Sequence, residues 1–282
     1  MTQKIELIGV SKRYKRESSE RWALREINLK ISQGEFVGIA GRNGSGKTTL
    51  ARMMNGLILP TAGRVLVNGM DTTDSGVLSR IRSLVGMVFQ NPDNQIVSPI
   101  VEEDIAFGPQ NLGLPLEEVK ERVERALNVM GLEELRFHAP HLLSGGQKQK
   151  VAIAAVMAMQ PSYLVLDEPT AMLDQQANYD LIGQLKRLHR EYNMTIILIS
   201  HHMEDLTFAD RVIVLDNGCV RLDGPPVEVF QDTARLESYG LRCPEVIQLA
   251  AKLRSKGCEL DPGIVNLEQM VKNICRLLML KV

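Results

Sequence analysis

The hydrophobic residues in the first third of the chain form short runs rather than helical stripes. Apolar or alternating segments bounded by Gly, Pro and polar residues predict strands at residues 4–10, 27–31, 35–40, 64–67 and 85–89. A helix is expected after the third of these strands, reaching to about residue 57, before the turn signals Pro60 and Gly63. The chain is therefore expected to begin with a strand-rich part that contains one early helix.

The pattern changes near residue 91, where apolar positions begin to recur at helical spacing. Helices are predicted at residues 101–107 and 116–130, and a longer one begins near Ser144. Strands return at residues 163–166, 195–199 and 211–216, and a helix at 175–192 separates the first two. This βα alternation is typical of an α/β fold with a mostly parallel sheet. Residues from about 91 to 160 are then a helical insert in that fold.

The last part of the chain is again helical. After Gly-Pro-Pro at 224–226, helices are predicted at residues 244–256 and 267–281, so we expect a large domain at 1–236 and a small helical domain at 237–282. The final helix carries an apolar stripe at Leu267, Met270, Val271, Ile274, Leu277, Leu278 and Lys281. The stripe needs a partner, and the sequence leaves open whether that is the first domain or a second subunit.

A glycine-rich segment, GRNGSGKTT at residues 41–49, stands between the predicted strand 36–40 and a helix. It matches G-x-x-x-x-G-K-[ST], in which backbone N–H groups and a helix N-terminus point at a polyphosphate. Lys47 would reach the β- and γ-phosphates, and the Thr48 hydroxyl would bind Mg²⁺. The nucleotide-binding residues predicted here are Gly41, Asn43, Gly44, Ser45, Gly46, Lys47, Thr48 and Thr49.

Two adjacent carboxylates follow the apolar strand in YLVLDE, residues 163–168. Asp167 can contribute to the Mg²⁺ shell, and Glu168 can polarise a water for attack on the γ-phosphate. A capped helix or a solvated turn would explain such a pair equally well if it stood alone. The phosphate loop upstream favours catalysis.

Composition excludes several classes of function. The chain has 44% hydrophobic and 24% charged residues and a formal net charge of -1, which is typical of a soluble globular protein and argues against general nucleic-acid binding. The N-terminus lacks the apolar core of a signal peptide, and we expect a cytoplasmic protein. Four cysteines without metal-ligand spacing are expected to be buried, reduced thiols.

LSGGQ at residues 143–147 places Ser144 at the N-cap of the long helix, which makes a second anion-binding helix start. With it, the chain resembles the ATP-binding cassette (ABC) ATPases over about residues 4–225. It carries their motifs in family order: the phosphate loop, Gln90, LSGGQ, YLVLDE, AMLD at 171–174, and Ser200-His201. The resemblance implies a P-loop NTPase cassette with a RecA-like sheet, an antiparallel β part and a helical subdomain.

Further roles follow from this resemblance alone. ATP would be sandwiched in a dimer between the phosphate loop of one subunit and the signature residues Ser144, Gly145, Gly146 and Gln147 of the other. Asp174 would reach across the dimer, Gln90 would touch Mg²⁺ and the attacking water, and His201 would hydrogen-bond the γ-phosphate. Tyr14 would stack on adenine, although Trp22 could also supply the ring. The family usually has Thr and an acid where Ser200 and His202 stand.

The chain is similar to the ATPase subunits of energy-coupling factor (ECF) transporters in the stretches FQNPDNQ at 89–95 and VEEDIAFG at 101–108 and in its C-terminal helices. That similarity implies a peripheral subunit on the cytoplasmic face of the cell membrane. Its partners would be a second ATPase, identical or paralogous, an integral membrane coupling protein that docks near residues 91–99, and a substrate-binding membrane protein. Uptake of vitamins or of cobalt or nickel ions is implied. A conventional ABC importer or exporter subunit is the alternative, and a soluble ABC switch is a more distant one.

Overall fold

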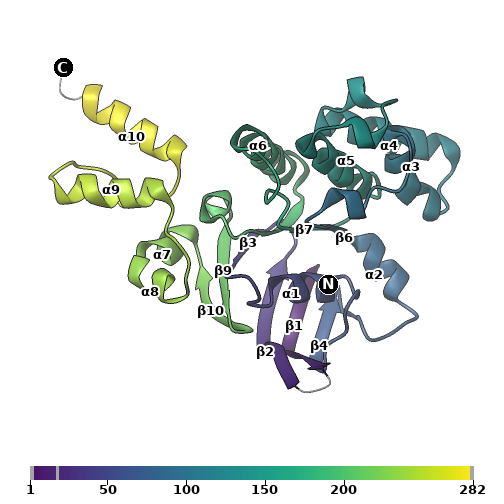
Figure 1. Cartoon of the computed structure of the whole chain (residues 1–282), viewed down its shortest axis with the longest axis horizontal. Helices are drawn as coiled ribbons and strands as arrows, with labels where there is room; N and C mark the ends of the chain where they lie inside the picture. Colours follow the sequence, from purple (N-terminus) through teal and green to yellow (C-terminus); the bar gives the residue numbers. More distant parts are fainter. Residues whose placement is uncertain (1–2, 17–18, 280–282) are drawn as a thin grey trace.

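The centre of the molecule is a six-stranded sheet of order β10-β9-β3-β8-β7-β6 (Figure 1). The computed structural model describes residues 3–16 and 19–279. All neighbouring pairs in the sheet are parallel except β9 with β10. The strands are β3 (Phe36–Ala40), β6 (Val85–Val88), β7 (Tyr163–Asp167), β8 (Thr195–Ile199), β9 (Arg211–Asp216) and β10 (Cys219–Gly224). The predicted α/β fold with a mostly parallel sheet is confirmed.

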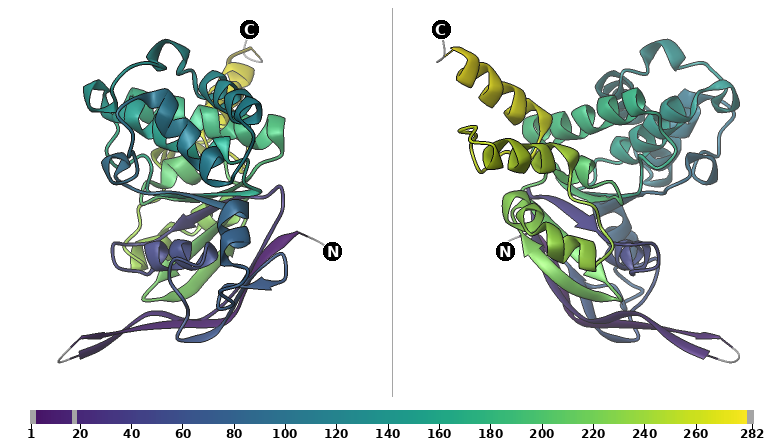
Figure 2. Two further views of the ribbon diagram at one scale, coloured as in Figure 1. Left: turned by 90° about the vertical axis from the view of Figure 1, so that its right-hand side faces the viewer. Right: turned by 60° about the vertical axis from the view of Figure 1, so that its left-hand side comes forward.

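A second, antiparallel sheet has the order β2-β1-β4-β5 and is built from β1 (Lys4–Arg16), β2 (Ser19–Ser32), β4 (Ala62–Val67) and β5 (Met70–Asp71). The strands predicted at 4–10 and 27–31 were too short. Both continue into a long hairpin that extends away from the body of the molecule (Figure 2). This extension is rich in Lys, Arg and Glu and lacks apolar alternation, so no strand pattern could reveal it.

Two hydrophobic cores lie on opposite faces of the six-stranded sheet. Along β7, Tyr163 and Val165 face a core shared with the antiparallel sheet and α1 (Lys47–Met54), whereas Leu164 and Leu166 face a core shared with helices. This alternation follows from the two-residue period of a strand. Because β7 and β8 are buried on both faces, they read as continuous apolar runs, which is why the sequence located them accurately.

The helical insert contains α3 (Val101–Asn111), α4 (Leu116–Met130) and α5 (Gly145–Ala158). The helix predicted at 101–107 is longer, because α3 continues through Pro109. Within α3, a Cβ at Gly108 would meet the side chain of Met159 at the C-cap of α5, so glycine lets these two helices pack closely. The 3₁₀ turn Pro92–Asn94 lies between β6 and α3, and the 3₁₀ turns Glu133–Leu135 and Pro140–Leu142 lie between α4 and α5.

The C-terminal segment lies beyond the β10 edge of the sheet, on the side away from the insert (Figure 1). It contains α7 (Pro226–Gln231), α8 (Thr233–Ser238), α9 (Glu245–Ser255) and α10 (Leu267–Met279). The end of the helix predicted at 267–281, with Lys281 of its stripe, lies outside the described residues. Within the described chain, no helix combines the length and apolar character that crossing a bilayer requires.

The apolar stripe of α10 is divided between two environments. Met270 is buried and, with Ala250 and Ile264, forms a small cluster of the C-terminal helices. Val271 and Leu278 remain more than half exposed, at 52% and 62%. The helix is tied to α6 (Gln175–Tyr192) by an ion pair of 3.0 Å between Lys186 and Glu268. One part of the stripe therefore packs within the chain and the other part is uncovered. The division into domains at residue 237 stays a prediction.

The four cysteines are free, but they do not share one environment. Only Cys243 is buried; Cys219 is half-buried, and Cys258, in the connection between α9 and α10, and Cys275, on α10, are exposed. The expectation of buried thiols was therefore wrong for Cys258 and Cys275. Both belong to the small helical unit, whose core is too small to enclose them.

Candidate active site

The phosphate loop joins the end of β3 to the start of α1, as predicted. Its glycines are required by close contacts: Gly46 has φ of 110°, and a Cβ there would clash with the carbonyl oxygen of Ala23. A Cβ at Gly41 would clash with the carbonyl oxygen of Leu215. The Lys47 ammonium donates hydrogen bonds to the carbonyl oxygens of Gly41 at 2.7 Å and Arg42 at 3.2 Å. The cation is thereby held inside the loop.

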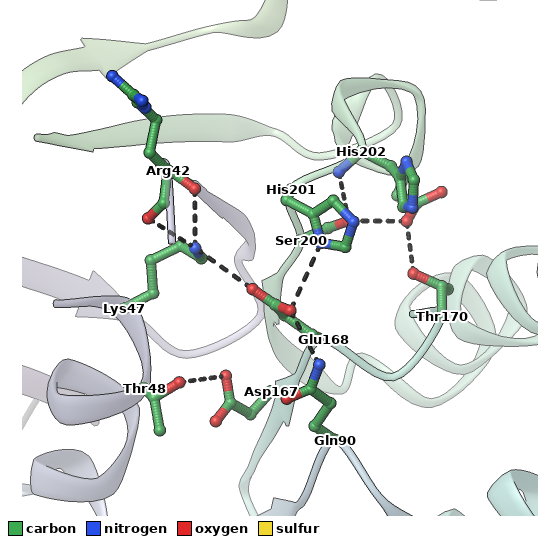
Figure 3. Close-up of polar contacts among 12 residues, drawn as sticks. Arg42, Lys47, Thr48, Gln90, Asp167, Glu168, Thr170, Ser200, His201 and His202 are labelled. Atoms are coloured by element: carbon green, nitrogen blue, oxygen red, sulfur yellow. Dashed lines mark hydrogen bonds and ion pairs between the residues drawn. The ribbon is translucent and has the colours of Figure 1, made fainter. Parts of the chain in front are cut away.

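Glu168 is the point where the predicted catalytic residues meet (Figure 3). One carboxylate oxygen lies 3.3 Å from Lys47 Nζ, and the other accepts from Gln90 Nε2 at 3.2 Å and lies 3.4 Å from His201 Nδ1. These three partners come from α1, the end of β6 and the end of β8. Parallel strands place their carboxyl ends at one edge of the sheet, and this explains why residues so distant in sequence converge.

The backbone of Glu168 is held in an unfavourable conformation. Its φ of 50° lies in the left-handed region, which costs a non-glycine residue on the order of 1–3 kcal/mol. Two backbone hydrogen bonds stabilise it: its N–H donates to Ile199 O at 3.0 Å, and its carbonyl accepts from Ala171 N at 3.2 Å. Such strain at a residue with three charged or polar partners is typical of functional sites.

Asp167 and Thr48 form a second contact beside Glu168. Thr48 Oγ1 donates to Asp167 Oδ1 at 3.1 Å, and the carboxylate is buried. Burial raises the pKa of Asp167, and the Thr48 hydrogen bond opposes that shift. A buried carboxylate next to a hydroxyl at the phosphate loop is the oxygen-ligand chemistry that Mg²⁺ prefers. The residues present fit the predicted magnesium site.

A cavity of about 820 Å³ opens above the loop, large enough for a nucleotide. Tyr14 lines it, with its hydroxyl 3.5 Å from Thr49 Oγ1, whereas Trp22 is not among the lining residues. Tyr14 and Arg21 are register partners on β1 and β2, and both reach the cavity. The remaining lining residues are Ala23, Asn43, Gly44, Gly46, Lys47, Thr48, Gln90 and Glu168.

The signature segment does not line this cavity. Ser144 caps α5 as predicted: its Oγ accepts from Gln147 N at 3.3 Å, and Gln147 Oε1 accepts from Ser144 N at 2.9 Å. Gly145 and Gly146 form the first turn of that helix. Asp174 caps α6 by accepting from Ala177 N at 2.8 Å. These residues therefore lie apart from the phosphate loop of their own chain.

Several residues of the site were not predicted. Gln95 accepts from Phe89 N at 3.0 Å and donates to Ala152 O at 3.1 Å, so it fastens the segment around Gln90 to α5. Lys148 makes a second link between them through a 2.8 Å ion pair with Asp93. Gln95 belongs to FQNPDNQ, so the motif drew attention to it, but its partner lies 57 residues away and no sequence pattern identifies it.

The similarities to known proteins are extensive. A family model described as "ABC transporter" matches residues 24–171. The chain is 53% identical to "Energy-coupling factor transporter ATP-binding protein EcfA1" of Caldanaerobacter subterraneus subsp. tengcongensis, over 92% of this chain and 94% of the relative.

Solved structures agree with this similarity. That of cbiO1 from Clostridium perfringens, described as part of the ABC transporter complex cbiONQ, superposes with a TM-score of 0.76 at 36% identity, over 89% of this chain and 100% of the other. A dimeric post-hydrolysis state of the ATP-binding cassette MJ0796, bound to ADP and Pi, superposes with a TM-score of 0.72 at 33% identity, over 79% and 98% of the two chains.

Proposed function

The chain belongs to the ABC transporter ATPases of the energy-coupling factor type, and on that premise we propose which of its residues bind ATP and hydrolyse it. The observation that carries the proposal is the convergence of Lys47, Gln90 and His201 on the Glu168 carboxylate, at distances of 3.2 to 3.4 Å, beside the nucleotide-sized cavity. A cation, an amide and an imidazole around one carboxylate are suited to positioning a water and balancing charge in phosphoryl transfer.

The polyphosphate binds along the loop from Gly41 to Thr49, and the adenine ring stacks on Tyr14. Lys47 then exchanges its contacts with the Gly41 carbonyl and Glu168 for phosphate oxygens, because a polyphosphate is the stronger acceptor for an ammonium group. Thr48, Asp167 and Gln90 would hold Mg²⁺. When bound, the ion supplies positive charge at the phosphate oxygens.

Glu168 orients the attacking water and accepts its proton, while His201 hydrogen-bonds the γ-phosphate and keeps the carboxylate aligned. The 3.4 Å approach of His201 Nδ1 to Glu168 already brings the two groups to one side of the loop (Figure 3). Catalysis of this kind depends on positioning and electrostatics, and it requires no covalent intermediate.

A second ATPase subunit, identical or paralogous, completes the site. The segment Ser144 to Gln147 forms a partly exposed helix start. Its capping box uses the N–H groups of Ser144 and Gln147, and among the described residues those of Gly145 and Gly146 have no acceptor, which suits an anion presented by another subunit. Asp174 stands at the start of α6 and contributes to the same contact. The two subunits thus close on ATP, each supplying the signature for the other's phosphate loop.

The membrane partner docks in a groove of about 620 Å³ between α2 (Leu78–Leu84), α3 and α5. Val97 and Phe107 line it and are 65% and 49% exposed, so the groove offers apolar surface to a helix. Gln95, at its edge, is hydrogen-bonded to the backbone of Phe89, next to Gln90. This arrangement would transmit movement between the partner and the ATP site.

The assembled transporter places this subunit at the cytoplasmic face of the membrane, under a coupling protein and a separate substrate-binding protein. Substrate selection resides in that separate protein, and a vitamin or a cobalt or nickel ion is the proposed cargo.

Binding of a fluorescent ATP analogue to the purified chain tests the nucleotide site. Tyr14→Ala removes the ring that lines the cavity and is expected to raise the Kd about tenfold, because stacking on a base contributes about 1–3 kcal/mol. Trp22→Ala removes a ring of the same hairpin that is not part of the lining and is the matched control. Equal losses in the two variants, or none in Tyr14→Ala, would contradict the assignment.

A further inference from the structure

A buried carboxylate, Asp205, lies behind the catalytic residues in the 3₁₀ turn Met203–Leu206. It is 4% exposed and makes no ion pair within the described part of the chain. Three side chains donate to it instead: Thr170 Oγ1 at 2.7 Å and Ser200 Oγ at 2.8 Å bond to Oδ2, and Asn178 Nδ2 at 3.1 Å bonds to Oδ1. A buried charge is tolerated only with such compensation, so the network is constrained as a unit.

Each donor belongs to a segment that carries a proposed catalytic or dimer-contact residue. Thr170 is two residues after Glu168, and Ser200 directly precedes His201 (Figure 3). Asn178 is in the first turn of α6, whose N-cap is Asp174, and its N–H donates to the Asp174 carbonyl at 2.9 Å. The carboxylate therefore connects the segments that follow β7 and β8.

The segments that follow β7 and β8 carry Glu168 and His201, and a connection between the two segments is needed to hold these residues at a fixed separation. Glu168 has a left-handed backbone, and the turn after it has to return the chain to Asp174. On the other side, Ser200 Oγ also accepts from His202 N at 3.0 Å, which fixes the backbone that carries His201. The strands β7 and β8 are paired up to Asp167 and Ile199, and beyond that point Asp205 joins the two turns through their side chains.

We propose that Asp205 is a positioning residue for ATP hydrolysis. Through Thr170 and Ser200 it sets the separation of Glu168 and His201, and through Asn178 it fixes the start of α6 at Asp174. This inference rests on the proposed function. Since Asp205 is not among the residues that line the nucleotide cavity, its loss changes turnover and leaves nucleotide binding intact.

The test uses Asp205→Ala in the transporter complex and measures kcat and KM for ATP together with the Kd of a fluorescent ATP analogue. We expect kcat to fall at least tenfold while the Kd stays within twofold. Thr207→Val is the matched control, because it removes a buried hydroxyl that donates to the Glu204 carbonyl at 2.8 Å in the same turn but lies outside the network. Its kcat is expected to stay within twofold of wild type.

Milder variants keep the test decisive if Asp205→Ala does not fold. Thr170→Val and Ser200→Ala each remove one hydroxyl donor, and each is expected to lower kcat severalfold with an unchanged Kd. In the double variant, which carries both Thr170→Val and Ser200→Ala, the fold loss of kcat should be smaller than the product of the two single losses, since residues of one network are coupled.

Three results would overturn the proposal: a normal kcat in Asp205→Ala or in both single-donor variants, multiplicative losses in the double variant, or parallel losses of kcat and nucleotide affinity. A wild-type complex that hydrolyses no ATP would instead remove the proposed function, and the inference with it.

Discussion

Single residues determine the chemistry of this site through their backbone conformations as much as through their side chains. Gly46, with φ of 110°, starts α1 where a Cβ would clash, and Glu168, with φ of 50°, turns its carboxylate toward Lys47. The identities of these residues follow from sequence motifs. Their backbone conformations do not, because these depend on neighbours such as Ile199 and Ala23 that are remote in sequence.

Cysteine reactivity offers a prediction at the same scale. Burial raises the pKa of the Cys243 thiol to about 11, and the thiol donates to the Phe230 carbonyl at 3.3 Å. Because the thiolate is the reactive form and a raised pKa keeps the thiol protonated below about pH 11, Cys243 should resist iodoacetamide at pH 8. Cys258 and Cys275 are exposed and should react in the native protein.

Peptide mass mapping before and after unfolding measures this difference. Cys243 is expected to be modified only after unfolding in denaturant, so its modification in the folded chain at the rate of Cys258 would contradict its burial.

At the scale of elements, buried strands and amphipathic helices were predictable and small connecting elements were not. The predicted bounds of β8, β9, α4 and α6 agree with the structure, since apolar runs or a helical stripe mark them. The elements α2, β5, β10, α7 and α8 were missed because they are short and only partly buried. The capping box at Ser144 was anticipated as an N-cap, since its bonds are local.

The uncovered face of α10 gives a prediction about assembly. Val271→Asp places a charge on a side chain that is 52% exposed, so the free energy of unfolding should change by about 0.5 kcal/mol or less. If this face contacts a second subunit, the charge should reduce recovery of the ATPase pair in size-exclusion chromatography at least fivefold. Lys272→Asp, an exposed neighbour on the same helix, is the control. Unchanged recovery with Val271→Asp would assign the face to solvent.

At the scale of the whole molecule, the proposed ATP site lies between two structures that partners would contact. The central sheet carries the Glu168 cluster at the carboxyl ends of its strands, the helical insert lies on one side and the C-terminal helices lie on the other (Figure 1). The order of the motifs predicted this arrangement in outline. The hydrogen bonds of Gln95 and Asp205 that connect its parts are long-range and could not be predicted from patterns.

The docking groove gives a prediction at this scale. Phe107→Asp introduces a charge into apolar lining and should reduce co-purification of membrane subunits about tenfold, because an unpaired charge in an interface is costly. Phe137→Asp is the control, since Phe137 is 75% exposed and belongs to the same helical insert but lies outside the groove. Similar losses in both variants would show that the effect is not specific to the groove.

The central claim is that Glu168 drives hydrolysis of ATP held by the phosphate loop. Single-turnover hydrolysis by the purified transporter complex with Glu168→Gln tests this claim most directly. Glutamine keeps the shape of the side chain but cannot accept the proton of the water, so the rate should fall by about 10²- to 10⁴-fold. ATP should still bind, because Lys47 and the loop are intact, and the ATPase pair should remain closed. A variant that hydrolyses bound ATP at the wild-type rate would contradict the account.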